Sequence, residues 1–207
     1  MKKRILCYGD SNTHGYTPGG GRYGDAQRWP VIMRQALGAD VTVIEEGLNG
    51  RTLVHDDPTE GGYKSGLSYL PPCLMSHAPL DLLCVMLGTN DTKQRFNNTA
   101  YNIAQGLEAL VRLARRYADC PILIISPPHI GENLMDTAMG PIFGPGAIAL
   151  SRALAGEFAR VARENGCHYL NAALLCPPCA QDAVHLTEES QRALGLGAAQ
   201  KAREILY

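Results

Sequence analysis

The hydrophobic and polar positions of the chain divide it into short apolar runs and longer stretches with helical spacing. Apolar runs that predict strands cover residues 4–8, 41–44, 81–87, 121–125 and 167–170. Stretches with one apolar face predict helices over residues 28–37, 100–117, 147–165 and 188–206, and Thr187 is placed to cap the last of these. Apolar strands that alternate with helices are typical of a parallel sheet covered on both faces. The pattern therefore predicts an α/β fold: one three-layer α/β/α domain over residues 1–207, around a central parallel five-stranded sheet.

Two stretches, residues 48–78 and 127–146, fit no regular element. Both are rich in Gly and Pro, and each follows the carboxyl end of a predicted strand. Ligand sites in doubly wound sheets lie outside these strand ends, and long loops there often form the pocket. We therefore expect these two stretches to surround the functional site.

Composition and charge narrow the range of partners. The chain of 207 residues has a formal net charge of −1 with scattered Lys and Arg, which argues against a nucleic-acid partner. No apolar run reaches the ~18 residues of a membrane span, so we expect no membrane partner. The apolar run after Arg4 is shorter than the roughly 7–15 apolar residues of a secretory signal. We expect a cytoplasmic protein whose mature chain starts at Met1.

The seven cysteines are read most simply as reduced thiols. Cys7 and Cys84 fall in predicted buried strands, where a thiol packs as a small hydrophobic group. Cys176 and Cys179 form a CxxC motif that, with Cys167, offers ligands for zinc or a redox pair. The sequence has no second CxxC at zinc-ribbon spacing. Packing thiols are therefore favoured, and a zinc or redox protein remains an alternative.

The ends of the predicted strands carry a set of groups suited to acyl transfer. Ser11 follows the first strand, Gly50 the second and Asn90 the third, and Asp182 and His185 precede the last helix. A serine hydroxyl needs a base to take its proton, and histidine held by a carboxylate is the usual base. Developing oxyanion charge needs fixed donors, for which the backbone N–H groups of Ser11 and Gly50 and the Asn90 side chain are placed. The predicted catalytic residues are Ser11, Asp182 and His185.

The same residues carry a resemblance to a known family. The GDS at residues 9–11, Gly50, the GTND at residues 88–91 and the D-x-x-H at residues 182–185 resemble the four blocks of the SGNH/GDSL hydrolases. Stretches such as VIEEGLNGRT, DDPTEGG and VMLGTNDTK are similar to the bacterial arylesterase and acyltransferase (perhydrolase) subgroup. The resemblance implies a flavodoxin-like sheet, an acyl-enzyme on Ser11, no metal, no organic cofactor and a homo-oligomer.

Four further residues are candidates for the substrate pocket. Asp10 and Asn12 flank Ser11, and His14 stands where close relatives often have Trp. His129 follows the fourth strand. His14 is also a weaker alternative to His185 as the base, and Asp10 is more readily a turn brace than a catalytic acid. The group at residues 55–57 (His, Asp, Asp) precedes a proline and is expected to form a turn, not a metal site.

These observations favour a serine carboxylic-ester hydrolase that acts on small acyl esters, such as aryl esters, with acyltransfer as a side activity. A carbohydrate O-acetyl esterase or a thioesterase on the same triad is the first alternative. A non-catalytic flavodoxin-like binding module is the second, and here every catalytic group expected of an active enzyme is present. The expected partner is a small-molecule ester.

Overall fold

The computed structural model describes residues 2–177 and 179–207, and it places a five-stranded parallel sheet at the centre of the chain. The strand order is β2-β1-β3-β4-β5, the flavodoxin-like order, and every neighbouring pair is parallel. The strands are β1 (Lys3–Gly9), β2 (Val41–Gly47), β3 (Leu82–Met86), β4 (Ile122–Ser126) and β5 (His168–Asn171). The predicted fold class is confirmed.

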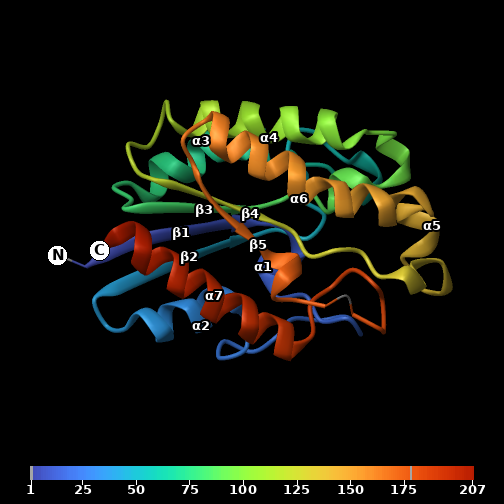
Figure 1. The fold of residues 1–207 in the computed structure, drawn as a ribbon, viewed down its shortest axis with the longest axis horizontal. Helices are drawn as coiled ribbons and strands as arrows, with labels where there is room; N and C mark the ends of the chain where they lie inside the picture. The colour runs from blue at the N-terminus through green and yellow to red at the C-terminus, as the bar shows by residue number, and fades with distance from the viewer. Residues whose placement is uncertain (1, 178) are drawn as a thin grey trace.

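Helices cover both faces of the sheet, which gives three layers (Figure 1). The helices α3 (Gly66–His77), α4 (Ala100–Ala114) and α6 (Gly146–Glu164) lie on one face. The helices α2 (Trp29–Leu37) and α7 (Glu188–Leu206) lie on the other face. Two short helices, α1 (Ser11–His14) and α5 (Gly140–Phe143), lie at the carboxyl edge of the sheet. No helix within the described residues is long and apolar enough to cross a membrane.

The alternation of side chains along β1 shows why this sheet is apolar on both faces. Leu6 and Tyr8 pack with the cluster under α3, α4 and α6, whereas Ile5 and Cys7 pack with the cluster under α2 and α7. Successive side chains of a strand point to opposite faces, so a strand covered on both sides must be apolar throughout. Cys7 and Cys84 are buried in this way, as predicted.

Besides the short helices α1 and α5, the longer helix α3 was not predicted. The stretch of residues 48–78, read as irregular, contains α3 (Gly66–His77). The helix begins with a Ser65 side chain that accepts a hydrogen bond from the backbone of Ser68, and it contains Pro71 and Pro72. Leu70 and Leu74 bury its apolar side against the sheet, and this packing outweighs the local cost of the two prolines.

The other predicted elements are close to those observed. The helix predicted over residues 100–117 ends at Ala114, where Arg115 is the C-cap. Thr187 caps α7 by accepting from the backbone of Ser190, as predicted. The loop of residues 127–146 folds back onto the segment that carries His185. Its buried side chains form a small separate core together with Ala147, Ala183 and Val184: Ile130, Leu134 and Phe143.

Candidate active site

Ser11 is held at the end of β1 by a tight turn into α1. The Asp10 side chain accepts from the backbone N–H of Asn12 at 2.9 Å and caps α1. Gly9 leaves no space for a side chain, because a Cβ there would lie 2.0 Å from Oγ1 of Thr13. Gly47 on the neighbouring strand is equally restricted, since a Cβ would lie 2.1 Å from the backbone nitrogen of His14. Two glycines on adjacent strands therefore let α1 pack directly against the sheet edge and fix the position of Ser11.

His185 and Asp182 lie in a short turn before α7. Oδ1 of Asp182 accepts from the backbone N–H groups of Val184 and His185 at 3.0 and 2.8 Å. Oδ2 of Asp182 lies 2.7 Å from Nδ1 of His185. Ala183 adopts a positive φ of 65°, which closes this turn. Burial alone would raise the pKa of Asp182, but the hydrogen bonds from His185 and the turn backbone lower it below the usual value. The aspartate is therefore ionised at neutral pH.

The three predicted catalytic side chains form one hydrogen-bonded chain. Nε2 of His185 lies 3.1 Å from Oγ of Ser11, on the side of the ring opposite Asp182. All three residues are buried. This arrangement lets the imidazole take the serine proton while the carboxylate stabilises the imidazolium that forms.

The three expected oxyanion donors face the same cavity as Ser11 and His185. Gly50 has a φ of 78°, and a Cβ there would lie 2.4 Å from Oε2 of Glu60. Nδ2 of Asn90 donates to the carbonyl of Arg51 at 3.1 Å, which orients the amide. A side-chain amide has two N–H groups, so Asn90 keeps one for a ligand. Ser11, Gly50 and Asn90 thus line one cavity, and their service as oxyanion donors stays a prediction.

The cavity at Ser11 has a volume of about 200 Å³. Drug-sized ligands occupy pockets of roughly 300–1,000 Å³, so this cavity suits a small group. Several larger cavities exist, among them one of about 520 Å³ beside Glu46 and Tyr69, but it contains none of the predicted catalytic groups. Besides the groups already described, these side chains and segments line the catalytic cavity: Tyr16, Asn49, Glu60, Lys93, Met139, Ile142, Phe143 and Val184.

Several of these lining residues were missed by sequence reasoning. The Tyr16 ring lies against the His185 ring, with centroids 4.6 Å apart. Lys93 is only 3% exposed, and its Nζ lies 2.5 Å from Oε1 of Glu60 and 3.6 Å from Oδ2 of Asp57. A buried lysine needs such partners because an unpaired charge is costly to bury. The Lys93–Glu60 ion pair therefore forms an ionic wall of the cavity, and Met139, Ile142 and Phe143 contribute an apolar wall.

The four residues expected to line the pocket are absent from the lining that the structure describes. Asn12 lies beneath it and holds the His185 segment: its Oδ1 accepts from the backbone of Leu186 at 3.0 Å. Asp10 caps α1. His14 packs its backbone against Gly47, and His129 lies half-buried on the loop after β4. Position 14 is expected at the pocket wall because close relatives often have Trp there, but His14 is not among the residues that line this cavity.

The remaining cysteine and histidine candidates have structural contacts. Sγ of Cys176 donates to the carbonyl of Ser190 at 3.3 Å, and Sγ of Cys179 accepts from the backbone of Gln181 at 3.3 Å. Pro178, within the CxxC motif, lies outside the described residues. His55 stacks on Phe96, with ring centroids 4.8 Å apart. The two aspartates that follow it form a turn, in which the Asp56 side chain accepts from the backbone of Asp57.

Two buried carboxyl groups lie under the site. Burial raises the pKa of Asp10 to about 6. Burial raises the pKa of Asp91 to about 7. The charge of Asp10 also raises this pKa, whereas the hydrogen bond from the backbone of Leu53 lowers it. Both oxygens of Asp91 lie 3.0 Å from the backbone nitrogen of Leu53. Asp91 thereby connects β3 to the loop that contains Gly50.

We expect Asp91 to contribute stability that is lost as the pH rises from about 4 to about 7, because folded Asp91 keeps a proton that the unfolded chain has released. The Asp91→Asn variant has no such proton, so over this range the free energy of unfolding of the wild type should fall relative to that of the variant. Urea unfolding at several pH values measures both slopes. Asp119→Asn, at an exposed aspartate, should keep the wild-type slope. Identical slopes for wild type and Asp91→Asn would show that Asp91 is already ionised in the fold.

Comparisons with known proteins agree with this geometry. A model of the GDSL-like lipase/acylhydrolase family matches residues 7–193. The structure is similar to that of the native M. smegmatis aryl esterase, with a TM-score of 0.91 and 37% identity over 99% of this chain and 100% of that one. It is also similar to Est24, a carbohydrate acetylesterase from Sinorhizobium meliloti, with a TM-score of 0.92 and 35% identity over 98% of this chain and 99% of that one.

A second Sinorhizobium meliloti structure, a carbohydrate acetylesterase family member, has a TM-score of 0.92 and 39% identity, and the match covers 99% of each chain. No curated protein matches the chain. The family match spans most of the sequence, and the similar structures are matched over nearly their full length. The chain therefore belongs to the GDSL-like lipase/acylhydrolase family and is an esterase of that family.

Proposed function

We propose that this esterase hydrolyses esters of short acyl groups, aryl esters in particular, through an acyl-enzyme on Ser11. The single observation that carries the proposal is the hydrogen-bonded chain from Asp182 through His185 to Ser11, which opens onto a cavity of about 200 Å³. The small volume favours an acetyl-sized acyl group. The family resemblance and the similarity to an aryl esterase support the choice of an aryl alcohol as the leaving group.

In the first half of the reaction, Oγ of Ser11 attacks the ester carbonyl carbon and Nε2 of His185 takes the hydroxyl proton. The carbonyl oxygen becomes an oxyanion, which the N–H groups of Ser11, Gly50 and Asn90 stabilise. The tetrahedral intermediate collapses, the bond to the leaving oxygen breaks, and His185 returns the proton to that oxygen. The alcohol or phenol departs and the acyl group stays on Ser11.

In the second half, a water molecule gives a proton to His185 and attacks the acyl-enzyme. A second tetrahedral intermediate breaks down to the free acid and Ser11, with the proton returned from His185 to Oγ. Asp182 stays ionised throughout and fixes the ring with Nδ1 protonated. An alcohol or hydrogen peroxide in place of this water would give acyltransfer, which we propose as the side activity.

Carbohydrate O-acetyl esters are the second candidate substrate class. Two of the similar structures are carbohydrate acetylesterases, and the ionic wall of Glu60 and Lys93 offers hydrogen-bonding groups to sugar hydroxyls. A thioesterase reaction would use the same triad. The expectation of a homo-oligomer stays a prediction, which light scattering on the purified protein checks.

The proposal is tested with p-nitrophenyl esters of increasing acyl length. We expect kcat/KM to be highest for the acetate and at least about tenfold lower for the octanoate, because the longer chain exceeds the cavity. Ile142→Ala, which shortens the apolar wall, should narrow this difference. Leu196→Ala, at an exposed leucine on α7, is the matched control and should leave it unchanged.

A higher kcat/KM for the octanoate than for the acetate would contradict the short-acyl proposal. The same preparation assayed with an acetylated sugar and with an aryl acetate separates the two leaving groups. A larger kcat/KM for the sugar ester would replace the arylesterase proposal by the carbohydrate one.

A further inference from the structure

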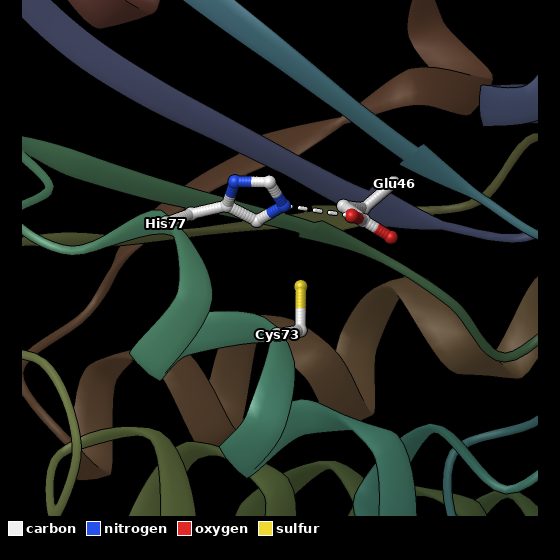
Figure 2. Close-up of side chains that lie close together, drawn as sticks. All are labelled: Glu46, Cys73 and His77. Atoms are coloured by element: carbon white, nitrogen blue, oxygen red, sulfur yellow. Dashed lines mark hydrogen bonds and ion pairs between the residues drawn. The ribbon is translucent and has the colours of Figure 1, made fainter.

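Three side chains of metal-binding type meet between β2 and α3, outside the catalytic cavity. They are Glu46, Cys73 and His77, and one ligand atom from each lies within 4.8 Å of the other two. Figure 2 shows the sulfur of Cys73 pointing toward the gap between the His77 ring and the Glu46 carboxylate. Nε2 of His77 lies 2.8 Å from Oε1 of Glu46. The described part of the chain contains no other such group of three.

The backbone keeps these three residues together independently of any contact among them. Cys73 and His77 are four residues apart on α3, so they lie on one face of the helix. Glu46 lies near the carboxyl end of β2, in register with Tyr8 of β1. Leu70 and Leu74 anchor α3 in the buried core. Two rigid elements thus present the ligands, which is how a preorganised metal site is built.

We infer that Glu46, Cys73 and His77 bind one thiophilic divalent metal ion, with zinc as the best match. A thiolate, an imidazole and a carboxylate together are a zinc-type ligand set, whereas magnesium and calcium take oxygen ligands. Zinc with one thiolate and one carboxylate is electrically balanced. Water would take the fourth tetrahedral position. Glu46 lines a cavity of about 520 Å³, through which both the ion and this water can reach the site.

The ligand positions need only a small adjustment. Zn–N and Zn–O bonds of about 2.1 Å in a tetrahedron place the two ligand atoms roughly 3.4 Å apart. Nε2 of His77 and Oε1 of Glu46 must therefore separate by about 0.6 Å from their hydrogen-bonded distance while the sulfur moves in. Both side chains are partly exposed and have freedom to move. Arg51 donates to the backbone carbonyl of Glu46, so that contact leaves the carboxylate to the metal.

Binding also moves two protons. The imidazole must carry its proton on Nδ1 so that Nε2 can bind the ion, and the thiol of Cys73 must release its proton to solvent. A thiolate ligand favours zinc or cobalt over hard cations such as magnesium and calcium.

The test uses Co²⁺ as a spectroscopic probe and Zn²⁺ as its competitor. Wild type titrated with Co²⁺ should show a thiolate-to-cobalt charge-transfer band that saturates at one equivalent per chain and disappears when Zn²⁺ is added. Cys73→Ala should lose the band. His77→Gln should weaken Zn²⁺ binding by at least about 100-fold. Mutation of a residue that only hydrogen-bonds to a metal ligand costs about 10–100-fold, so a larger loss indicates a direct ligand.

Two cysteine variants serve as matched controls. Cys120→Ala and Cys179→Ala remove a half-buried and a buried thiol elsewhere in the fold, and both should keep the band. None of these cysteines touches the catalytic cavity, so hydrolysis of p-nitrophenyl acetate by each variant verifies that it is folded.

Wild type without a charge-transfer band overturns the inference, and so does a Cys73→Ala variant that keeps the band. Loss of the band in Cys179→Ala with retention in Cys73→Ala would place the metal at the CxxC motif and also overturn it.

Discussion

Replacing Ser11 by alanine is expected to lower kcat for p-nitrophenyl acetate by about 10⁴-fold or more, the scale of loss when a triad member is removed. The variant keeps the cavity and the Gly50 and Asn90 donors but has no oxygen to form the acyl-enzyme. Folding should be unaffected, because Ser11 Oγ contacts only the His185 ring among the hydrogen-bond partners that the structure describes. Circular dichroism and urea unfolding verify this.

Ser68→Ala is the matched control for Ser11→Ala. Ser68 lies on α3 and lines the large cavity beside Glu46, not the catalytic one. It should retain wild-type kcat. If Ser11→Ala hydrolysed the ester at the wild-type rate, the nucleophile would have to be another group, and the proposed acyl-enzyme route would be wrong.

Replacing Asp182 by asparagine is expected to lower kcat by about 10⁴-fold with the fold intact. Oδ1 of Asp182 accepts from two backbone N–H groups, so the carbonyl oxygen of the asparagine must take that position. Its NH₂ group then faces Nδ1 of His185, which has to accept instead of donate. The ring proton moves to Nε2, and the imidazole can no longer take the proton of Ser11.

The measurement is the kcat of Asp182→Asn beside that of Asp119→Asn, a control at an exposed aspartate before β4. The control should retain wild-type activity. A loss of less than about tenfold in Asp182→Asn would indicate that Asp182 only braces the turn, and that His185 finds its tautomer without it.

The sheet and the meeting of the candidate catalytic groups at one edge could be predicted because two simple rules apply to them. Residues 81–87 are apolar without interruption, which is the pattern of a strand buried on both faces. Once the strands were placed, the rule for parallel sheets brought Ser11, Gly50 and Asn90 to one edge. His185 lies 174 residues from Ser11, and it was predicted as the partner from the chemistry of the D-x-x-H motif together with the family resemblance.

Helix α3 and the pocket wall depend on contacts that no local pattern reports. Pro71 and Pro72 disfavour a helix when only the local sequence is considered. The Ser65 cap and the spacing of Leu70 and Leu74 were signals in favour of one. Phe143 belongs to the pocket because its loop packs on Val184, a contact that arises only in the folded chain. The ion pair of Lys93 with Glu60 is another contact of this kind.

The clamp formed by Asn12 has a consequence for how activity develops as the protein is made. Oδ1 of Asn12 accepts from the backbone N–H of Leu186, and the backbone carbonyl of Asn12 accepts from Nε2 of Gln191 at 3.0 Å. Ser11 is therefore synthesised early, while its base and the clamp's partners arrive among the last twenty-odd residues. We therefore expect a nascent or truncated chain that lacks this C-terminal part to hydrolyse no ester, however well its first strands are formed, so that ester turnover reports the docking of the C-terminal part.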